Sequence, residues 1–349
     1  MLFILKMTNK CNLTCGYCHS RGDSIGDVRS VFNKMKDFLT YGDEVILHGG
    51  EPLLIDYDTI EEILAFDKCR IRSLQTNLTL LTDRHIELFK KYGVGIGTSF
   101  DGFCGSRGSH DIELKVVENI ERLKSSGVSV NVICVVSDKN AYDYQSTRNT
   151  FNQVASLNTF IRWNYCSGME NMASYWDKDA HIQLFKLSIP LMVEKGMSVR
   201  PFENFITSAS GLFPFNRECS NHMCRLKNGI FGIMPNGNVT FCCKSKDVTL
   251  GNIFNTPFPD IIDSFDFSKY QERYKILRDG DCKGCQAWAV CQGGCMGDAP
   301  GIHEKAGTCE STRAIFDYMV SGEMERDFPE YDFMDYCKRA ALKEGFCNG

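Results

Sequence analysis

Short apolar and β-branched runs alternate with amphipathic runs through the first 195 residues of the chain. Short β-rich runs predict strands over Leu2–Lys6, Glu44–His48, Ile71–Gln75, Val94–Ser99, Val128–Val136 and Thr159–Tyr165. Runs at helical spacing predict helices over Val28–Tyr41, Asp58–Phe66, Thr82–Lys91, Asp111–Ser125, Ala141–Val154 and Asp177–Lys195. Six strand–helix repeats indicate parallel βαβ units, and they are too few to close an eight-stranded barrel. We therefore expect an α/β fold for residues 1–200, a partial (β/α)6 TIM-like barrel.

The pattern changes after residue 200. Residues 201–320 are rich in Cys, Gly, Asn and Pro, and only Gly229–Met234 and Asn238–Cys243 have the pattern of strands. We therefore expect a loop-rich C-terminal domain that is held together by something other than an apolar core. Residues 321–349 are expected to form a helical tail, in which Gly322 and Pro329 interrupt the helices.

Composition and charge exclude several classes of protein. Of the 349 residues, 43% are hydrophobic and 24% are charged, which is typical of a globular protein rather than a disordered or collagen-like one. The net charge of −5 argues against a nucleic-acid-binding surface and a polybasic membrane tether. No apolar run approaches the roughly 20 residues that cross a bilayer, and the apolar start is too short for a signal peptide. We therefore predict a cytoplasmic protein that binds neither nucleic acid nor membrane.

The chain contains 18 cysteines, which is unusual for a cytoplasmic protein. Disulfide scaffolds are typical of small secreted domains, whereas clustered cysteines in a reducing compartment more often bind metal. Cys11, Cys15 and Cys18 form the motif CNLTCGYC after the first predicted strand. Three thiolates leave one iron of a 4Fe–4S cluster without a protein ligand. A zinc site closed by His19 as a fourth ligand is the alternative interpretation.

Polar motifs also follow the next three predicted strands. Residues 49–52 read GGEP, residues 75–77 read QTN and residues 99–102 read SFDG. Because the carboxyl ends of parallel strands meet at one rim, we expect these motifs and the cysteine motif to surround one site. Paired glycines let the backbone approach a ligand closely, and the carboxylate of Glu51 is suited to bind an amino group. The alternative is a tight turn with a solvated acid.

Taken in order, the motifs CNLTCGYC, HGGEP, QTN and SFDG make residues 1–200 resemble the radical S-adenosylmethionine (SAM) superfamily. The resemblance implies that Cys11, Cys15 and Cys18 hold a 4Fe–4S cluster whose open iron chelates the methionine moiety of SAM. It further implies reductive cleavage of SAM to methionine and a 5′-deoxyadenosyl radical, which abstracts a hydrogen from the substrate in a dry cavity.

The resemblance also implies which residues bind SAM. These are Tyr17, Gly49, Gly50, Glu51, Asn77, Ser99 and Arg107. Residues 49–51 would hold the amino group, and Ser99 would contact the carboxylate or the ribose. The backbone of Tyr17 would lie near the adenine, and Arg107 is in the place of a family arginine, although the loop before it is shorter. Asn77 is either a further ligand or a helix cap.

Eight further cysteines are spaced as in the SPASM extension of radical SAM enzymes. They are Cys219, Cys224, Cys242, Cys282, Cys285, Cys291, Cys295 and Cys309, in a pattern C-x12-G-x4-C from Cys224 and C-x2-C-x5-C-x3-C from Cys282. Two zinc knuckles within residues 282–295 are the alternative, which leaves the other four unexplained. The resemblance implies two fully ligated auxiliary 4Fe–4S clusters, hence three clusters in the chain. It gives the first auxiliary cluster Cys219, Cys224, Cys242 and Cys295, and the second Cys282, Cys285, Cys291 and Cys309.

Cys243 directly follows a predicted cluster ligand and is the candidate catalytic residue. In sulfatase-maturating relatives the corresponding position holds an aspartate that is proposed as a base, so this chain departs from that pattern. A thiolate at Cys243 would accept the proton that leaves the substrate. The alternatives are that Cys243 replaces Cys242 as a cluster ligand, or that it packs without a role.

The resemblance implies a peptide substrate. Enzymes with this extension mostly oxidise peptides or crosslink them through C–C, thioether or ether bonds, and the motifs look closest to maturases of ribosomally made peptides, including those that form cyclophanes. We expect a precursor peptide and an electron donor such as flavodoxin or ferredoxin as partners. Because the first strand begins at residue 2, we expect no leader-binding domain before the barrel, so the barrel and extension or a separate leader-binding protein would bind the precursor. The alternatives are sulfatase-maturase-like oxidation of Cys or Ser, radical modification of a small metabolite, and a zinc-stabilised binding protein.

Overall fold

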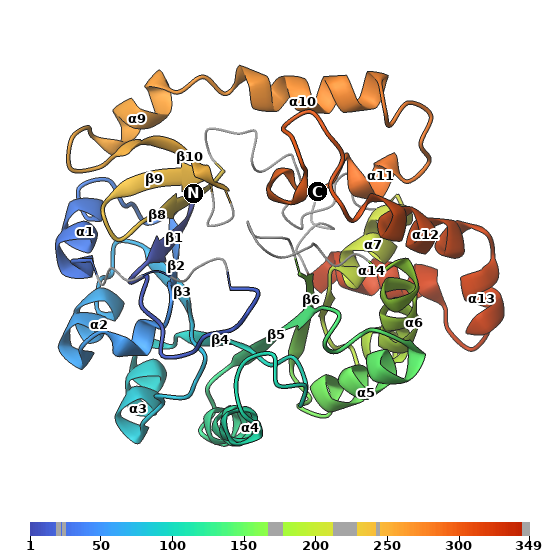
Figure 1. Ribbon diagram of the computed structural model, residues 1–349, viewed down its shortest axis with the longest axis horizontal. Coiled ribbons are helices and arrows are strands. Elements are labelled where there is room, and N and C mark those ends of the chain that lie inside the picture. The colour runs from blue at the N-terminus through green and yellow to red at the C-terminus, as the bar shows by residue number, and fades with distance from the viewer. Residues whose placement is uncertain (19–21, 23–25, 167–176, 212–228, 242–244, 344–349) are drawn as a thin grey trace. The chain divides into compact units, whose positions relative to one another are not determined.

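The computed structural model describes residues 1–18, 22, 26–166, 177–211, 229–241 and 245–343 (Figure 1). The chain forms two compact units. Unit 1 comprises residues 1–133 and 224–267, and unit 2 comprises residues 134–223 and 268–349. Each unit therefore combines part of the predicted barrel with part of the C-terminal region. The division into domains at residues 200 and 320 stays a prediction.

Unit 1 is built on a mixed sheet with a parallel centre. Its strands are β1 (Leu2–Lys6), β2 (Glu44–His48), β3 (Arg70–Gln75), β4 (Gly95–Ser99), the first four residues of β5 (Val130–Val136), β8 (Ile230–Ile233), β9 (Asn238–Phe241) and β10 (Ser245–Asn252). Their order is β10-β9-β8-β1-β2-β3-β4-β5. Strands β1 to β5 pair in parallel, β8 pairs in parallel with β1, and β9 pairs antiparallel with β8 and β10. The sheet is not closed, since β10 pairs with β9 alone among the described residues. The predicted α/β fold with an incomplete barrel is confirmed.

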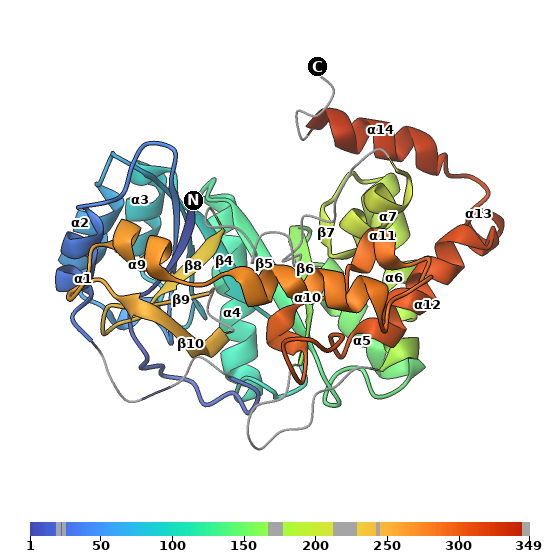
Figure 2. The same ribbon diagram turned by 90° about the horizontal axis from the view of Figure 1, so that it is seen from above.

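The helices of unit 1 cover one face of this sheet (Figures 1 and 2). They are α1 (Val28–Met35), α2 (Tyr57–Leu64), α3 (Asp83–Tyr92), α4 (His110–Ser125) and α9 (Phe258–Ser264), with a 3-10 turn at Pro52–Leu54. Helix α3 begins at Thr82, whose hydroxyl accepts from the His85 backbone N–H as its sequence predicts. Helix α1 is shorter than predicted, because the residues after Met35 continue as single turns.

The strands of the parallel sheet lie close to their predicted limits because alternate residues face the core. In β1, Phe3 and Leu5 are fully buried. The ring of Phe3 lies 5.1 Å from that of Phe258 and Phe38 stacks on Phe258 at 4.6 Å, which packs helix α9 against the start of the sheet. Aromatic packing therefore joins the C-terminal part of unit 1 to its first strand.

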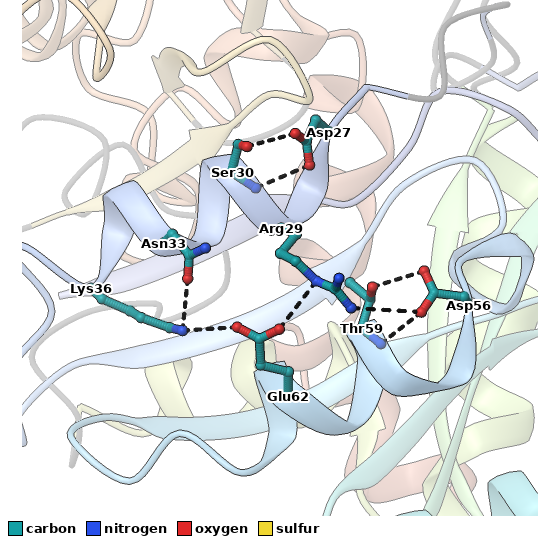
Figure 3. A network of polar contacts seen from close by, with 8 residues as sticks. All are labelled: Asp27, Arg29, Ser30, Asn33, Lys36, Asp56, Thr59 and Glu62. Atoms are coloured by element: carbon teal, nitrogen blue, oxygen red, sulfur yellow. Dashed lines mark hydrogen bonds and ion pairs between the residues drawn. The ribbon is translucent and has the colours of Figure 1, made fainter.

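A surface network joins helices α1 and α2 (Figure 3). Arg29 of α1 and Lys36, which caps the C-terminus of α1, both pair with Glu62 of α2, each at 3.1 Å. Asp27 caps α1 and Asp56 caps α2, each accepting a backbone N–H three residues later. The ion pairs therefore join α1 to α2 at the surface, and the two caps begin the helices.

Unit 2 is mainly helical. It contains β6 (Phe160–Tyr165) and β7 (Val199–Arg200), which pair in parallel, and the helices α5 (Tyr144–Ala155), α6 (Lys178–Val193), α7 (Phe202–Ala209), α10 (Ser268–Asp279), α11 (Trp288–Cys291), α12 (Cys309–Val320), α13 (Glu323–Asp327) and α14 (Phe333–Lys343). A 3-10 turn spans Met296–Asp298. Helices α13 and α14 lie in the region where the sequence predicts a helical tail, with Gly322 at φ 81° before α13. No helix in the described parts of the chain is long and apolar enough to span a bilayer.

Residues 201–320 hold more regular structure than the sequence predicts. Strand β10 and helices α7, α9, α10 and α11 lie in a region that composition indicates to be loops. Helix α10 shows why its pattern is weak. Its buried residues include Tyr270, Arg273 and Leu277. Arg273 is 1% exposed, and its Nη2 donates to the carbonyls of Gly293 at 3.1 Å and Glu304 at 2.8 Å. A buried arginine in the inner stripe obscures the apolar periodicity.

Candidate functional site

The carboxyl ends of β1 to β4 meet at one edge of the unit 1 sheet, and the four predicted motifs follow them. The loop after β1 is bonded directly to the loop after β2. The N–H groups of Gly50 and Glu51 donate to the carbonyls of Thr8 and Lys10, at 2.7 and 2.8 Å. These bonds fix the segment that leads into Cys11.

Gly49 and Gly50 are required by this contact between the two loops. A Cβ at Gly50 would lie 2.0 Å from the Lys10 carbonyl oxygen, and one at Gly49, whose φ is 154°, would lie 2.6 Å from that of Thr8. The two glycines therefore allow the loop after β2 to lie close to the backbone of the cysteine loop. Their contact with SAM stays a prediction.

Glu51 is fully buried and binds three neutral donors. Its Oε1 accepts from the Leu53 N–H at 2.9 Å and the Thr76 hydroxyl at 2.6 Å, and its Oε2 accepts from the Asn77 N–H at 2.7 Å. Burial raises the pKa of Glu51, while these hydrogen bonds and the charge of Arg107 act in the opposite direction. No cationic side chain of the described residues forms an ion pair with it. The alternative of a turn with a solvated acid is therefore wrong.

Asn77 bridges the loop after β3 to the cysteine loop. Its Oδ1 accepts from the N–H and the hydroxyl of Thr79, and its Nδ2 donates to Asn12 Oδ1 at 2.9 Å. The same Nδ2 lies 3.7 Å from the sulfur of Cys11. Helix α3 is capped by Thr82, so Asn77 is not its cap.

Tyr17 joins the cysteine loop to the loop after β4. Its hydroxyl donates to Asp101 Oδ2 and accepts from Arg107 Nη1 at 2.7 Å, and the Ser106 hydroxyl donates to Asp101 at 2.9 Å. Burial raises the pKa of Tyr17 well above its usual value, and the charge of Asp101 raises it further. The Nε of Arg107 is buried and has no hydrogen-bond partner among the described residues. Arg107 therefore keeps one donor for another ligand. Ser99 ends β4 at the same edge and is partly exposed.

Cys11, Cys15 and Cys18 lie together on the loop after β1, each partly exposed. The Cys18 N–H donates to the Cys15 carbonyl at 3.1 Å. Burial raises the pKa of Cys11 and of Cys15, and the charge of Cys18 raises both further, so the three thiols lie within electrostatic reach of one another. Among the described residues, no three Cys, His, Asp or Glu side chains converge as ligands of one metal ion. A 4Fe–4S cluster takes one thiolate per iron and accepts thiols that are further apart. His19 lies outside the described residues.

The charges and thiols at this edge fit a cluster with bound SAM. Glu51 is a buried anion without a cationic partner among the described residues, and Arg107 is a cation with a buried donor to spare. The methionine moiety of SAM carries both an ammonium and a carboxylate, which such a pair of groups complements. Sequence reasoning missed Thr76 and Asp101 as site residues, although both belong to motifs that it identified.

Five of the eight SPASM cysteines lie in the described part of unit 2. Burial raises the pKa of Cys291 to about 12, and the charges of Cys309, Cys282 and Cys285 raise it further. Burial also raises the pKa of Cys282, and the charges of Cys309 and Cys285 raise it further. The four thiols that influence one another are those that the resemblance gives to the second auxiliary cluster. Cys219, Cys224, Cys242 and Cys243 lie outside the described residues.

Two family models match the chain. The radical SAM superfamily model matches residues 5–148, and the SPASM iron–sulfur cluster-binding domain model matches residues 224–286. An uncharacterized protein of Methanocaldococcus jannaschii is 29% identical over 153 residues, which are 39% of this chain and 53% of that protein. The chain thus spans about half the length of this relative.

Two other relatives are similar over most of the chain. The cysteine-type anaerobic sulfatase-maturating enzyme of Clostridium novyi is 23% identical over 92% of this chain and 95% of its own length. The radical SAM cyclopropyl synthase TigE of Paramaledivibacter caminithermalis is 23% identical over 94% of this chain and 75% of its own.

Solved structures share the fold. Native anSMEcpe with bound AdoMet (SAM) and Cp18Cys peptide has a TM-score of 0.77 at 19% identity, covering 97% of this chain and 99% of that one. SuiB of Streptococcus suis bound to the precursor peptide SuiA has a TM-score of 0.58 at 16% identity, covering 88% and 75%. With its two matched domains and its radical SAM fold, the chain belongs to the radical SAM superfamily and carries a SPASM iron–sulfur cluster-binding domain.

Proposed function

We propose that this radical SAM/SPASM enzyme modifies a peptide, forming an oxidised or crosslinked product during the maturation of a ribosomally made precursor. The observation that carries the proposal is that buried Glu51 and the spare donor of Arg107 lie at the same edge of the sheet as three thiols of one loop. Loaded with its cluster and SAM, such a site supplies a 5′-deoxyadenosyl radical that abstracts a substrate hydrogen.

The residues of this chain would bind and orient SAM. Glu51 would accept hydrogen bonds from the ammonium group on its Oε2 atom, to which the Asn77 N–H alone donates among the described residues. Arg107 would receive the carboxylate with its free Nε, while Tyr17 and Asp101 keep its guanidinium in place. Gly49, Gly50 and Ser99 line the same edge and are proposed as further contacts.

The SPASM cysteines would hold two auxiliary clusters with no open iron. One shared cluster is supported by the electrostatic effect of neighbouring thiols on the pKa of Cys282 and of Cys291, which involves Cys282, Cys285, Cys291 and Cys309. A fully ligated cluster is suited to accept the electron that a substrate radical must lose. Cys243 is proposed as the base for the accompanying proton. In a Cys243→Ser variant, normal iron and 5′-deoxyadenosine with little product would support that role, and lost iron would make Cys243 a ligand.

Relatives support a peptide as the substrate. The names of SuiB with SuiA and of anSMEcpe with the Cp18Cys peptide describe complexes with peptides. For this chain we propose a precursor peptide as partner, with a separate leader-binding protein, a flavodoxin or ferredoxin as donor, and a cytoplasmic location. For the product we propose, more specifically, a peptide crosslinked through a C–C bond, such as a cyclophane.

Oxidation of a Cys or Ser side chain, as in sulfatase maturation, is the second candidate. Similarity to the C. novyi sulfatase-maturating enzyme extends over 95% of that protein, whereas TigE is covered over 75%. The two candidates predict different products. Oxidation gives an aldehyde that a hydrazide reagent labels, whereas a crosslink removes hydrogen without forming an aldehyde.

The test uses the anaerobically purified and reconstituted chain. Incubated with SAM and dithionite, it is expected to release 5′-deoxyadenosine, and with synthetic peptides that contain Cys, Ser and aromatic residues it is expected to yield a peptide of altered mass. Absence of 5′-deoxyadenosine from protein that contains iron and sulfide would overturn the proposal. Zinc without sulfide would instead support the zinc-stabilised binding protein.

A further inference from the structure

The sulfur of Cys11 receives two N–H groups. The backbone N–H of Leu13 lies 3.4 Å from it, and the side-chain Nδ2 of Asn77 lies 3.7 Å from it. The sulfur of Cys15 differs, because its described contact is with the Arg107 carbonyl, an acceptor, at 3.9 Å. Among the hydrogen bonds of the described residues, donation to the first cysteine motif is therefore concentrated on Cys11.

The orientation of the Asn77 amide is fixed from its other side. Its oxygen accepts the Thr79 N–H at 2.9 Å and the Thr79 hydroxyl at 2.6 Å. Because the oxygen faces these two donors, the NH2 group must face Asn12 and the Cys11 sulfur. Asn77 is only 5% exposed, so water does not compete freely for the amide.

The backbone of Asn77 is fixed by Glu51. The Asn77 N–H donates to Glu51 Oε2 at 2.7 Å, and the Thr76 hydroxyl donates to Glu51 Oε1 while accepting the Leu78 N–H at 3.0 Å. Leu78 follows in the left-handed region at φ 62°. The carboxylate of the GGEP motif thus sets where the amide of the QTN motif lies.

We propose that Asn77 is a positioning residue which sets the reduction potential of the cluster at Cys11, Cys15 and Cys18 through its hydrogen bond to the Cys11 sulfur; the inference rests on the proposed function. Reduction adds one electron to the cluster, and the added negative charge is spread over its sulfurs. An N–H dipole that points at a sulfur stabilises the reduced form, so it raises the potential. Asn77 then acts on electron entry rather than on SAM binding.

The test is a redox titration of the full-length reconstituted enzyme with dithionite, followed by EPR. The SAM-binding cluster is identified by the part of the reduced spectrum that changes when SAM is added. In Asn77→Ala and in the near-isosteric Asn77→Leu, the ratio of reduced to oxidised cluster at a fixed potential is expected to fall about tenfold, which corresponds to about 59 mV for one electron. Iron content and the Kd of SAM are expected to stay as in the wild type.

Thr79→Val provides the matched control. It removes the hydroxyl next to the Asn77 oxygen but keeps the Thr79 N–H and the amide that faces Cys11, so its midpoint is expected to stay near the wild-type value. An unchanged midpoint in both Asn77 variants would overturn the inference. A weaker Kd for SAM with an unchanged midpoint would make Asn77 a SAM ligand instead. Failure of the proposed function would look different, because the wild type itself would then lack a SAM-sensitive cluster signal.

A second measurement tests the hydrogen bond directly in the wild type. Wild-type enzyme labelled with 15N in the asparagine side-chain amide, reduced without SAM, is expected to show a weak coupling between the cluster and a labelled nitrogen in pulsed EPR. In Asn12→Ala enzyme with the same label the coupling is expected to persist, because Asn12 contacts Asn77 but not the sulfur. Absence of the coupling in the wild type would contradict the hydrogen bond.

Discussion

Arg107 donates a hydrogen bond from Nη1 to the hydroxyl of Tyr17 at 2.7 Å, although the two residues lie 90 positions apart. Tyr17 lies between Cys15 and Cys18 in the sequence, and its hydroxyl donates a hydrogen bond to buried Asp101. The cysteine loop and the loop after β4 are thereby joined through one phenol. The Tyr17 hydroxyl therefore helps to hold the Arg107 guanidinium in its position.

Tyr17→Phe is the direct test of this contact. It keeps the ring and the backbone but removes the hydroxyl that links Arg107 to Asp101. A hydrogen bond to a charged group contributes about 1.5–3 kcal/mol, so SAM affinity is expected to fall roughly tenfold or more. Iron content should not change. Equilibrium binding of SAM to the reconstituted variant measures the effect.

Tyr92→Phe is the matched control, since the Tyr92 hydroxyl donates to Glu61 away from this edge. If Tyr17→Phe binds SAM as tightly as the wild type, only the backbone of Tyr17 takes part, as the sequence resemblance implies.

Glu51→Gln should weaken SAM binding without loss of cluster. The substitution keeps the size of the side chain and removes the negative charge that would pair with the ammonium of SAM, a contact worth about 1.5–3 kcal/mol. The Kd of SAM is expected to rise roughly 10- to 150-fold. Glu44→Gln, at the opposite end of β2 beside Arg70 and Arg72, is the control and should bind SAM normally. An unchanged Kd would leave Glu51 with a role only in holding Thr76 and Asn77.

The sequence predicts the position of this site better than its internal contacts. Strands β1 and β2 have their predicted limits because alternate side chains are buried, and the motifs after them follow directly. That Glu51 binds the Thr76 hydroxyl is not visible in the sequence, since the two residues are brought together only by the pairing of β2 with β3. Helix α10 was missed for a related reason: its inner face holds Arg273, whose backbone partners Gly293 and Glu304 lie 20 and 31 residues further along the chain.

Replacing Cys11, Cys15 and Cys18 together with alanine should remove one cluster and all SAM cleavage. Three clusters amount to about twelve irons per chain, so about a third of the iron should be lost. The measurement is iron and sulfide per chain together with 5′-deoxyadenosine after addition of dithionite. A variant that still makes 5′-deoxyadenosine would show that the cluster which cleaves SAM lies elsewhere. Cys69→Ala, at a buried position before β3, serves as the control.

Asp56→Ala should destabilise unit 1 without affecting the site. Asp56 accepts the N–H and hydroxyl of Thr59 at the start of α2, and loss of such a cap costs about 1 kcal/mol. The hydroxyl and N–H of Thr59 lower the pKa of Asp56 below its ordinary value of 3.8, so the contribution is complete above that value and is lost as the pH falls through the lower folded pKa. A lower urea midpoint at pH 7 is expected, whereas Asp37→Ala, on a surface pair with Lys34, should leave it unchanged.

Iron counts in paired variants can establish which SPASM cysteines share a cluster. Cys282→Ala and Cys309→Ala should each cost about four irons. The charge of Cys309 raises the pKa of Cys282, which favours a shared cluster. If the two residues bind the same cluster, the double variant should lose no more iron than either single variant. Cys295→Ala combined with Cys309→Ala should instead lose about eight, because Cys295 is assigned to the other auxiliary cluster.

Iron is measured per chain on the fraction that elutes as folded protein, since the SPASM clusters are expected to stand in for an apolar core and their loss should reduce solubility. Cys337→Ala provides the control, because that thiol is buried in α14 and donates to the Ile206 carbonyl at 3.8 Å. Additive losses in the Cys282 and Cys309 pair would place them on different clusters. If the double variant of Cys295 and Cys309 loses no more iron than either single variant, the two residues bind the same cluster.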